Sequence, residues 1–398
     1  MQSMDNIQRD WSRRKFIGNV AAGGATLMLN PLLFLANNPD DPRIAEIVAK
    51  TIGVDTHNHI DVPLNSDEFP GPKVDLAGEI RKSGLSAICM TFAVDYQKLS
   101  HEGEAYDRFI NGLNAMDEVL KTNNMKRALN LSDIKTAHVD RRPTVIQSVE
   151  GSHFLEGKLE RVGVAYDHGL RLLGLLHDSD ASMPLGDVYT NPPKWGGLTS
   201  FGADVIKECN RLGILMDLTH ASNETINAGL KLANKPVIVS HTGLDTQLGN
   251  NEFMAKMMRP RLISKEQAKI VADAGGVIGV WTHLSETPLE YAQNIKAMVE
   301  VVGVDHVCVG TDTKMTPAYR SPASQDSRPG DAKSQSGSGK DGGRVGERTN
   351  QTWQSQKSGF YFAVVEAMLK VGFGEDEIAK VGGGNFCRVF DAATSGLK

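Results

Sequence analysis

The sequence predicts an α/β protein whose parallel strands close into a (β/α)8 barrel of the TIM type. Short apolar runs rich in β-branched residues alternate along the chain with segments of helical periodicity, which is typical of βα units around a parallel sheet. About eight such runs are present, the number that closes a barrel. The chain has 398 residues, enough for a barrel of roughly 250 residues or more in one domain.

The expected strands and helices follow one another in a regular order. We expect strands at residues 51–57, 85–92, 144–150, 170–177, 214–220, 237–241, 277–281 and 307–312. The clearest helices are expected at residues 102–121, 200–211, 224–233, 265–274, 289–302 and 359–371. Ser264, with Gln267 three residues further on, predicts a capping box, and Gly275 and Gly276 are typical of a helix end.

The composition excludes several classes of protein. With 40 % hydrophobic and 23 % charged residues, 40 Gly and 16 Pro, the chain is of ordinary globular type, which excludes collagen, disordered and coiled-coil proteins. Because the formal charge is -5 and no long basic run is present, nucleic acid is not an expected partner. The four cysteines lie far apart and form no C-x-x-C pair, so we expect buried thiols.

The first 36 residues differ in character from the rest of the chain. A polar start leads to Arg13 and Arg14 and then to an apolar, Gly/Ala-rich stretch, which is the order of a twin-arginine export signal. We therefore expect recognition by the twin-arginine export machinery and a periplasmic or extracytoplasmic location. The alternative is a membrane anchor formed by the uncleaved apolar stretch.

Residues 37–398 are expected to form one catalytic domain. A Gly/Ser-rich segment at about 321–350 has no apolar periodicity and follows the last predicted strand, so we expect a long loop at the barrel mouth. About fifty residues remain after it, too few for a second core of ordinary size.

Nearly every predicted strand ends, at its carboxyl side, in a residue that can bind metal or transfer a proton. These residues are His57, His59, Glu150, His177, His220, His241 and Asp312. The carboxyl ends of barrel strands meet on the face that holds the active site. We therefore expect these side chains to be neighbours.

The chemistry of this set favours two metal ions that share one carboxylate. His57 and His59 are two residues apart in an extended segment, so both project to one side and can bind one ion. Glu150 could connect that ion to a second one held by His220 and His241, and imidazole ligands favour zinc. Such a pair generates a bridging hydroxide at neutral pH, which suits hydrolysis of an amide, ester or phosphoester.

The remaining histidines are expected to lie outside this set. We interpret His153, three residues after Glu150, as a loop residue, with support of the metal site as the alternative. His283 follows the seventh predicted strand, so contact with the site or the substrate is the alternative to a packing role there. The histidines interpreted as surface or packing residues are His101, His138, His168 and His306.

Eight short motifs together resemble the renal or membrane dipeptidase family, peptidase family M19 of the amidohydrolase superfamily. In chain order they are VDTHN (54–58), SVEG (148–151), RLLGLLH (171–177), NRLGILMDLTH (210–220), VIVSHT (237–242), GGVIGV (275–280), VGTD (309–312) and GGNFCRVF (383–390). The resemblance runs from about Ile52 to Phe390 and rests on the order and spacing of the motifs. It implies a barrel of the metallo-dependent hydrolase type with two zinc ions.

The resemblance implies a role for each residue of the predicted metal site. His57 and the residue at position 59 would bind the first zinc ion. Glu150 would bridge the two ions, and His220 and His241 would bind the second.

The resemblance also implies how substrate is held and cleaved. His177 would contact the substrate oxygen that becomes anionic, and Asp312 would pass a proton to the leaving amine. Arg261 would pair with the substrate carboxylate, with Arg259 as the other candidate for this contact. A free carboxylate clamped in this way limits substrates to short peptides.

The chain departs from the family pattern at two places. His59 stands where the family usually has aspartate, which raises the net charge of the metal site by one unit. After Asp312, the usual Asp-Phe-Asp-Gly becomes Asp-Thr-Lys-Met. These departures bear on metal preference and on substrate choice.

We therefore expect an exported zinc dipeptidase that hydrolyses short peptides, with a D-residue at the carboxyl end among the candidate substrates. One alternative keeps the barrel and the metals but acts as a hydrolase or lyase on another small amide, lactone or secondary metabolite. A second alternative is a non-catalytic barrel protein. The resemblance is also compatible with a homodimer.

Overall fold

The structure, a computed structural model, describes residues 41–319, 353 and 358–395. All of them fall in one compact unit, Pro39–Lys398. The predicted export signal at 1–36 and the predicted loop at 321–350 lie outside the described residues. Within the described part of the chain, no helix combines the length and the apolar character needed to span a bilayer.

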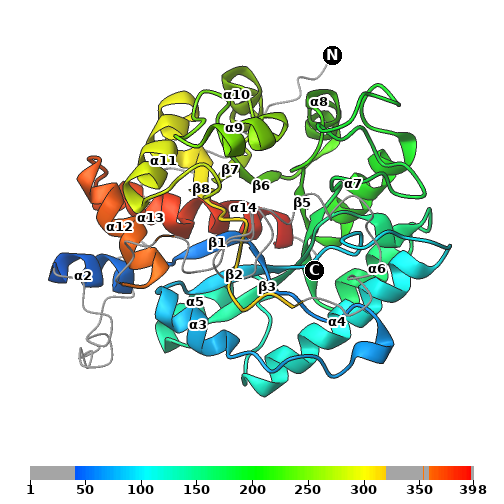
Figure 1. Ribbon diagram of the computed structural model, residues 1–398, viewed down its shortest axis with the longest axis horizontal. Helices are drawn as coiled ribbons and strands as arrows, with labels where there is room; N and C mark the ends of the chain where they lie inside the picture. Colours follow the sequence, from blue (N-terminus) through cyan, green and yellow to red (C-terminus); the bar gives the residue numbers. More distant parts are fainter. Residues whose placement is uncertain (1–40, 320–352, 354–357, 396–398) are drawn as a thin grey trace, which may run out of the picture. The chain divides into compact units, whose positions relative to one another are not determined.

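The strands confirm the predicted barrel-type sheet. They are β1 (Val54–His59), β2 (Ala87–Thr91), β3 (Thr144–Val149), β4 (Leu170–Gly174), β5 (Leu215–Asp217), β6 (Ile238–Thr242), β7 (Val277–Val280), β8 (Val307–Val309) and β9 (Thr313–Lys314). They pair in parallel in the order β8-β7-β6-β5-β4-β3-β2-β1-β9. The sheet lies in the middle of the ribbon with helices around it (Figure 1).

The last predicted strand, 307–312, is too long: β8 ends at Val309, and a further short strand that was not predicted, β9, begins at Thr313. β8 pairs with β7, whereas β9 pairs with β1 at the other end of the sheet. Between them, the Gly310 amide donates to the Val280 carbonyl at 3.2 Å, and the Asp312 amide donates to the His57 carbonyl at 3.1 Å. One short segment therefore joins the two ends of the sheet and brings Asp312 beside β1.

The six predicted helices are confirmed, each with both ends within two residues of the expected positions. They are α4 (Glu104–Thr122), α7 (Ser200–Leu212), α8 (Asn223–Leu232), α10 (Lys265–Asp273), α11 (Pro288–Val302) and α12 (Phe360–Lys370). The helices that were not predicted have ten residues or fewer, too short for a clear periodicity. They are α2 (Pro42–Lys50), α3 (Leu76–Ser83), α5 (Leu131–Asp140), α6 (Arg161–Asp167), α9 (Glu252–Met258), α13 (Glu375–Ala379) and α14 (Asn385–Thr394).

Of the two predictions about the ends of α10, the capping box is wrong and the glycine ending is confirmed. Ser264 accepts a hydrogen bond from the Gln267 amide at 3.1 Å, as expected of an N-cap. The Gln267 side chain does not return to Ser264 but donates to Asn227 on α8 at 2.9 Å, so the capping box is wrong. At the other end, Gly275 has a φ of 82° and donates to Ala272, which confirms the predicted glycine ending.

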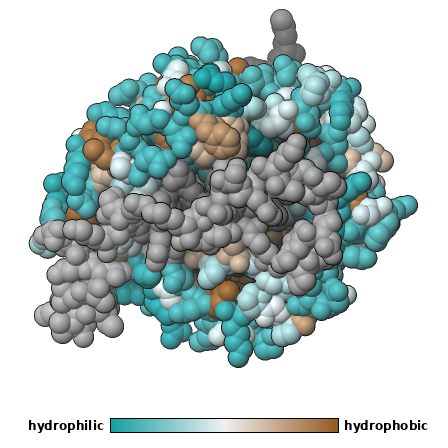
Figure 2. All heavy atoms as spheres, in the orientation of Figure 1, coloured by the Kyte–Doolittle hydropathy of each residue, from teal (hydrophilic) through white to brown (hydrophobic). Residues whose placement is uncertain are grey.

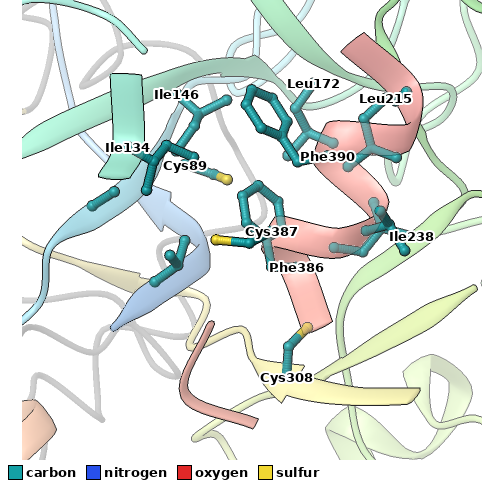
Figure 3. Close-up of a cluster of buried hydrophobic side chains, with 14 of the residues drawn as sticks. Cys89, Ile134, Ile146, Leu172, Leu215, Ile238, Cys308, Phe386, Cys387 and Phe390 are labelled. Atoms are coloured by element: carbon teal, nitrogen blue, oxygen red, sulfur yellow. The ribbon is translucent and has the colours of Figure 1, made fainter. Parts of the chain in front are cut away.

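Helix α14 packs across the amino-terminal ends of the strands. Phe386 and Phe390 lie in one buried cluster with Leu215 and Ile238, near the starts of β5 and β6 (Figure 3). The two phenylalanine rings stack with their centroids 5.5 Å apart. All four cysteines are free and buried, as predicted. Helix α14 thus covers the amino-terminal ends of the strands with apolar side chains, and the polar side chains lie at the carboxyl ends.

The outer surface is mostly hydrophilic on the face drawn in Figure 2, with separate hydrophobic spots. Among the described residues, the most exposed large hydrophobic side chains lie on different helices, Val139 on α5 at 65 % exposure and Phe253 on α9 at 63 %. Isolated exposed apolar residues of this kind are normal on globular proteins.

Two glycines allow close packing inside the barrel. A Cβ atom on Gly279 would come within 1.8 Å of the Ser240 carbonyl oxygen, and a Cβ atom on Gly310 within 1.9 Å of the same oxygen. That oxygen accepts a hydrogen bond from the Thr56 hydroxyl at 2.7 Å. Because these two residues are glycines, the backbones of four segments can approach one another closely here. The segments are β1, β6, β7 and the residues that follow β8.

We expect Gly310→Ala to destabilise the protein by about 1–3 kcal/mol or more, because the added methyl group has no room. The matched control is Gly163→Ala in α6, where a Cβ would meet nothing within 4 Å. This substitution should stabilise by about 0.5–1 kcal/mol through helix propensity. Urea unfolding checks both, and equal midpoints for Gly310→Ala and the wild type would contradict the packing argument.

Candidate metal centre

The predicted metal ligands come together at the carboxyl ends of the strands. His57 and His59 lie on β1, Glu150 follows β3, His220 follows β5 and His241 lies on β6. All five residues are buried. We call these five residues the metal cluster.

The Nε2 atoms of the four histidines face the Glu150 carboxylate. The distances to Oε1 are 2.8 Å from His220 and 3.4 Å from both His57 and His241, and His59 lies 3.6 Å from Oε2. The Nε2 atoms of His57 and His59 are 3.2 Å apart, as are those of His220 and His241. Four imidazole nitrogens around one carboxylate form a donor set that fits divalent transition metals such as zinc.

The negative charge of Glu150 suits a ligand shared by two metal ions. Burial alone would raise the pKa of Glu150, but the imidazoles of His177, His57 and His220 outweigh it and hold the pKa well below its usual range. The side chain is therefore a carboxylate at neutral pH. Both of its oxygens face histidine nitrogens, so it can contact an ion on each side.

A serine behind the cluster supports two ligands at once. The Ser240 hydroxyl lies 3.0 Å from His241 Nδ1 and 3.3 Å from His57 Nδ1. It also donates to Asp217 Oδ2 at 2.5 Å, and Asp217 Oδ1 accepts from the Ser240 amide at 3.1 Å. Such outer partners orient metal-binding histidines.

His220 has a strained backbone and two acceptors behind its ring. Its φ is 67°, in the left-handed region that residues with a side chain rarely adopt. Its Nδ1 lies 2.9 Å from the Tyr189 hydroxyl and 3.0 Å from Asp178 Oδ1. This turn after β5 points Nε2 at Glu150.

Asp312 lies between two histidines. Its Oδ1 is 3.0 Å from His59 Nε2 and its Oδ2 is 2.7 Å from His283 Nε2. Burial alone would raise the pKa of Asp312, but His241, His283 and His59 hold it well below its usual range. Asp312 also has a positive φ, 55°, which turns its side chain towards the cluster. His57, His59 and Asp312 could together hold one ion.

His177 is paired with a carboxylate on its outer side. Its Nδ1 lies 2.6 Å from Asp95 Oδ1, while its Nε2 lies 3.4 Å from Glu150 Oε2. Burial lowers the pKa of His177, but Glu150 and Asp95 outweigh it and raise the pKa to about 9. The imidazole is therefore protonated at neutral pH and can stabilise a developing oxyanion beside Glu150.

Of the two arginines proposed for the substrate carboxylate, Arg261 lies at the site. Its Nη2 contacts Asp178 Oδ2 at 2.5 Å, and Asp178 in turn contacts His220. Arg261 is 26 % exposed at its side chain, so its charge can be reached from solvent. Arg259, at the start of the same short turn, is exposed.

The other histidines lie outside the metal cluster, and the structure refines two of the predictions made for them. His283, for which contact with the site was the alternative, makes that contact through Asp312. His153, interpreted as a loop residue, is buried in a short 3-10 turn, where its Nε2 lies 2.9 Å from the Ser179 carbonyl. His138 and His306 contact Ser86 and a backbone carbonyl away from the cluster.

Several residues of the site were missed in the sequence. Asp95 and Tyr96 follow β2 by a few residues, so the rule of polar strand ends would have found them had it been applied to the second strand. Asp178 directly follows His177, and it was overlooked because His177 had already been taken as the polar residue at the end of that strand. The supporting pair of Ser240 and Asp217 was also missed, although a carboxylate inside an apolar strand is unusual and would have indicated a buried partner.

The family model of the membrane dipeptidases, peptidase family M19, matches residues 42–321. The chain belongs to the membrane dipeptidase family. The protein is therefore a metallo-dipeptidase, a hydrolase of the peptide bond, and the resemblance seen in the motifs is confirmed.

Other proteins are similar to this membrane dipeptidase family member. An uncharacterised protein from the pqqA 5' region of Klebsiella pneumoniae is 24 % identical over 202 residues, which cover 47 % of this chain and 71 % of that protein. An amidohydrolase from Pseudomonas aeruginosa has a TM-score of 0.69 at 22 % identity, covering 89 % of this chain and 99 % of its own. A metallo peptidase from Rhodobacter sphaeroides, liganded with a phosphinate mimic of the dipeptide L-Ala-D-Ala, has a TM-score of 0.62 at 16 % identity, covering 86 % and 99 %. These structures share the fold.

We expect Asp95→Asn to reduce stability in a pH-dependent way. The pKa of His177 is raised to about 9 in the folded protein, above its unfolded value of about 6.5. The stabilisation is therefore fully present below about pH 6.5 and is lost as the pH rises through about 9. In metal-free protein, the variant should unfold about 1–3 kcal/mol more easily than the wild type at pH 6, with a smaller difference at pH 10.

Urea unfolding in the presence of a chelator measures this difference. The control is Asp204→Asn on α7, an exposed carboxylate in a surface ion pair, which should stay within about 0.5 kcal/mol of the wild type at both pH values. A difference for Asp95→Asn that is the same at pH 6 and pH 10 would contradict the His177 assignment.

Proposed function

We propose that this metallo-dipeptidase is a zinc enzyme that hydrolyses short peptides with two ions in the metal cluster. The observation that carries the proposal is the convergence of four histidine Nε2 atoms on the Glu150 carboxylate in a member of this family. When bound, zinc would supply a hydroxide nucleophile at neutral pH and polarise the scissile carbonyl.

Two residues beside the cluster would handle the charges of the reaction. The protonated His177, held by Asp95, would donate a hydrogen bond to the carbonyl oxygen as that oxygen becomes anionic. Asp312 would accept the proton of the nucleophile and return it to the leaving amine. The His283 contact to Oδ2 would keep Oδ1 of Asp312 on the cluster side.

Arg261 would bind the carboxylate of a dipeptide, but it already has a partner. Asp178 contacts the guanidinium, so a substrate carboxylate must displace or share this contact. The same observation favours a second candidate function, hydrolysis of a small amide or lactone without a free carboxylate. Such a substrate would leave the Asp178–Arg261 pair intact.

We also propose the location and the finer substrate class. The order of Arg13, Arg14 and the apolar stretch supports export by the twin-arginine machinery to an extracytoplasmic compartment. A peptide with a D-residue at its carboxyl end is supported by the Rhodobacter sphaeroides metallo peptidase, which was liganded with a mimic of L-Ala-D-Ala. A homodimer stays a prediction.

The test is hydrolysis of a panel of L-L and L-D dipeptides by the purified protein, with metal content determined on the same sample. We expect cleavage that a chelator abolishes and about two zinc ions per chain. Asp312→Asn tests the proton-transfer role. The variant should retain both ions, because the asparagine oxygen can still face the ion beside His57 and His59, and it should lose most of the turnover.

The alternatives give different results in the same assay. Two ions without dipeptide cleavage would favour the small amide or lactone. A protein that takes up no metal would favour the non-catalytic barrel. Full turnover by Asp312→Asn would remove Asp312 from its proton-transfer role.

We expect Arg261→Ala to weaken chiefly the binding of substrates with a free carboxylate. Loss of a charge-assisted contact of this kind costs about 1.5–3 kcal/mol, so KM should rise at least about tenfold with a smaller change in kcat. The check is steady-state kinetics on a dipeptide and on its carboxyl-terminal amide. Equal losses on both substrates would argue against the carboxylate contact.

A further inference from the structure

A lysine lies next to the first histidine pair of the metal cluster. Lys314 is paired in register with His59, because β9 runs parallel to β1. The neighbouring pair in this register, Asn58 and Thr313, is joined by a side-chain hydrogen bond of 3.1 Å. Successive residues of a strand project to opposite faces of a sheet, and paired residues project to the same face. The Lys314 side chain therefore leaves the sheet on the face of His59, which is the face of the metal cluster.

A largely buried carboxylate holds the ammonium group of Lys314 at the mouth of the barrel. Lys314 Nζ lies 2.5 Å from Asp61 Oδ2, and the same oxygen accepts a hydrogen bond from the Tyr319 amide at 3.1 Å. Asp61 follows the last residue of β1, so the ammonium lies beyond the carboxyl end of that strand, where barrel enzymes bind their substrates. The side chains of Lys314 and Asp61 are 14 % and 9 % exposed, so water and salt screen the lysine charge only weakly.

The charge of Lys314 acts on the side of the cluster that would hold the first ion. Burial lowers the pKa of His59, Asp312 and Glu150 outweigh it and raise the pKa above its usual value, and the Lys314 ammonium opposes this rise. Both departures of the chain from the family pattern lie at this side. Lys314 stands at the third position of the usual Asp-Phe-Asp-Gly, so His59 and Lys314 each place nitrogen where the family usually has a carboxylate.

A second cation lies next to the other half of the cluster. Arg261 contacts one oxygen of Asp178, and the other oxygen of Asp178 contacts His220. Arg261 and Lys314 are thus placed alike, each held by one aspartate beside one half of the cluster. A peptide whose terminal carboxylate pairs with Arg261 would extend its acyl part across the cluster towards Lys314.

We propose that Lys314 is a specificity-determining residue that binds a carboxylate on the acyl part of the substrate. The proposal rests on the proposed function, in which Arg261 binds the carboxyl-terminal end of a short peptide. The favoured substrate is then a dipeptide with aspartate or glutamate as its amino-terminal residue. An ammonium group has three N–H donors, so Lys314 can contact Asp61 and a substrate carboxylate at the same time.

The experiment is a calorimetric titration of the full-length, zinc-loaded protein with two phosphinate mimics of a dipeptide. The mimics cannot be cleaved, and they differ only in the amino-terminal side chain, which is that of Glu or of Gln, with alanine as the second residue. The wild type should bind the Glu mimic at least about tenfold more tightly than the Gln mimic, the usual effect of a charge-assisted contact. In Lys314→Met, this ratio of affinities should fall below about twofold, because the ammonium is lost.

Two control variants separate this contact from other effects of charge. Lys207→Met removes the lysine of another Lys–Asp pair, formed with Asp204 on the exposed face of α7, and it should leave the ratio unchanged. Arg261→Ala should weaken the binding of both mimics by a similar factor, so it should also keep the ratio.

Three results would overturn the proposal. They are a ratio near one in the wild type, a tenfold ratio that persists in Lys314→Met, and a ratio that is lost in Arg261→Ala, since the acidic side chain would then be bound at the other end of the site. Because Lys314→Met leaves Asp61 without this ammonium, the double variant Asp61→Asn with Lys314→Met is titrated as well. It keeps the pair neutral and should show the same low ratio.

The titration also distinguishes this proposal from the proposed function. A wild-type protein that binds neither mimic would overturn both. A preference for the Glu mimic that depends on Lys314, in a protein that cleaves no dipeptide, would support the proposal and count only against the peptidase assignment.

Discussion

The contact between the Glu150 carboxylate and the imidazoles around it is the interaction on which the rest of the site depends. Moving a carboxylate out of water costs several kcal/mol unless positive charge and hydrogen bonds compensate for it. Glu150 is buried, and the compensating groups come from β1 and from the segments after β4 and β5, as well as from β6. A parallel barrel is suited to this task because it brings the carboxyl ends of strands that are distant in sequence to one place. The close packing of Gly279 and Gly310 against Ser240 keeps those strands in register beneath the ligands.

Much of this arrangement could be predicted from the sequence, because it follows from periodicity and from what stands at each strand end. Polar residues at the carboxyl ends of predicted strands were expected to be neighbours, and the structure brings His57, Glu150, His220 and His241 together. The contact of Tyr96 with His59 could not be predicted, since it depends on how a turn after β2 returns to β1. The end of β8 at Val309 and the separate strand β9 were also not predicted, because the polar residues between them continue the pattern of a strand end.

One carboxylate lies beside the departure from the family pattern at position 59. A neutral histidine there removes one negative charge from the first ion, and Asp312, which the family pattern shares, lies 3.0 Å from its Nε2. His220 and Asp312 hold positive φ values, which cost about 1–3 kcal/mol each and are typical of functional sites. The other described residues that have a side chain and a positive φ, Asn124, Arg141 and Glu156, lie at the ends of helical turns and not among the metal ligands.

The position of α14 has a consequence for how the chain is made. The phenylalanines that fill the amino-terminal end of the barrel, Phe386 and Phe390, follow all of the strands in the sequence. On the ribosome, β1 emerges more than three hundred residues before this helix does. Since domains fold as units and incomplete cores expose apolar surface, the barrel cannot be finished until α14 has been translated. Until then, the amino-terminal ends of the strands expose the apolar side chains that α14 covers in the finished protein. Chaperones can bind these side chains while the strands are being synthesised.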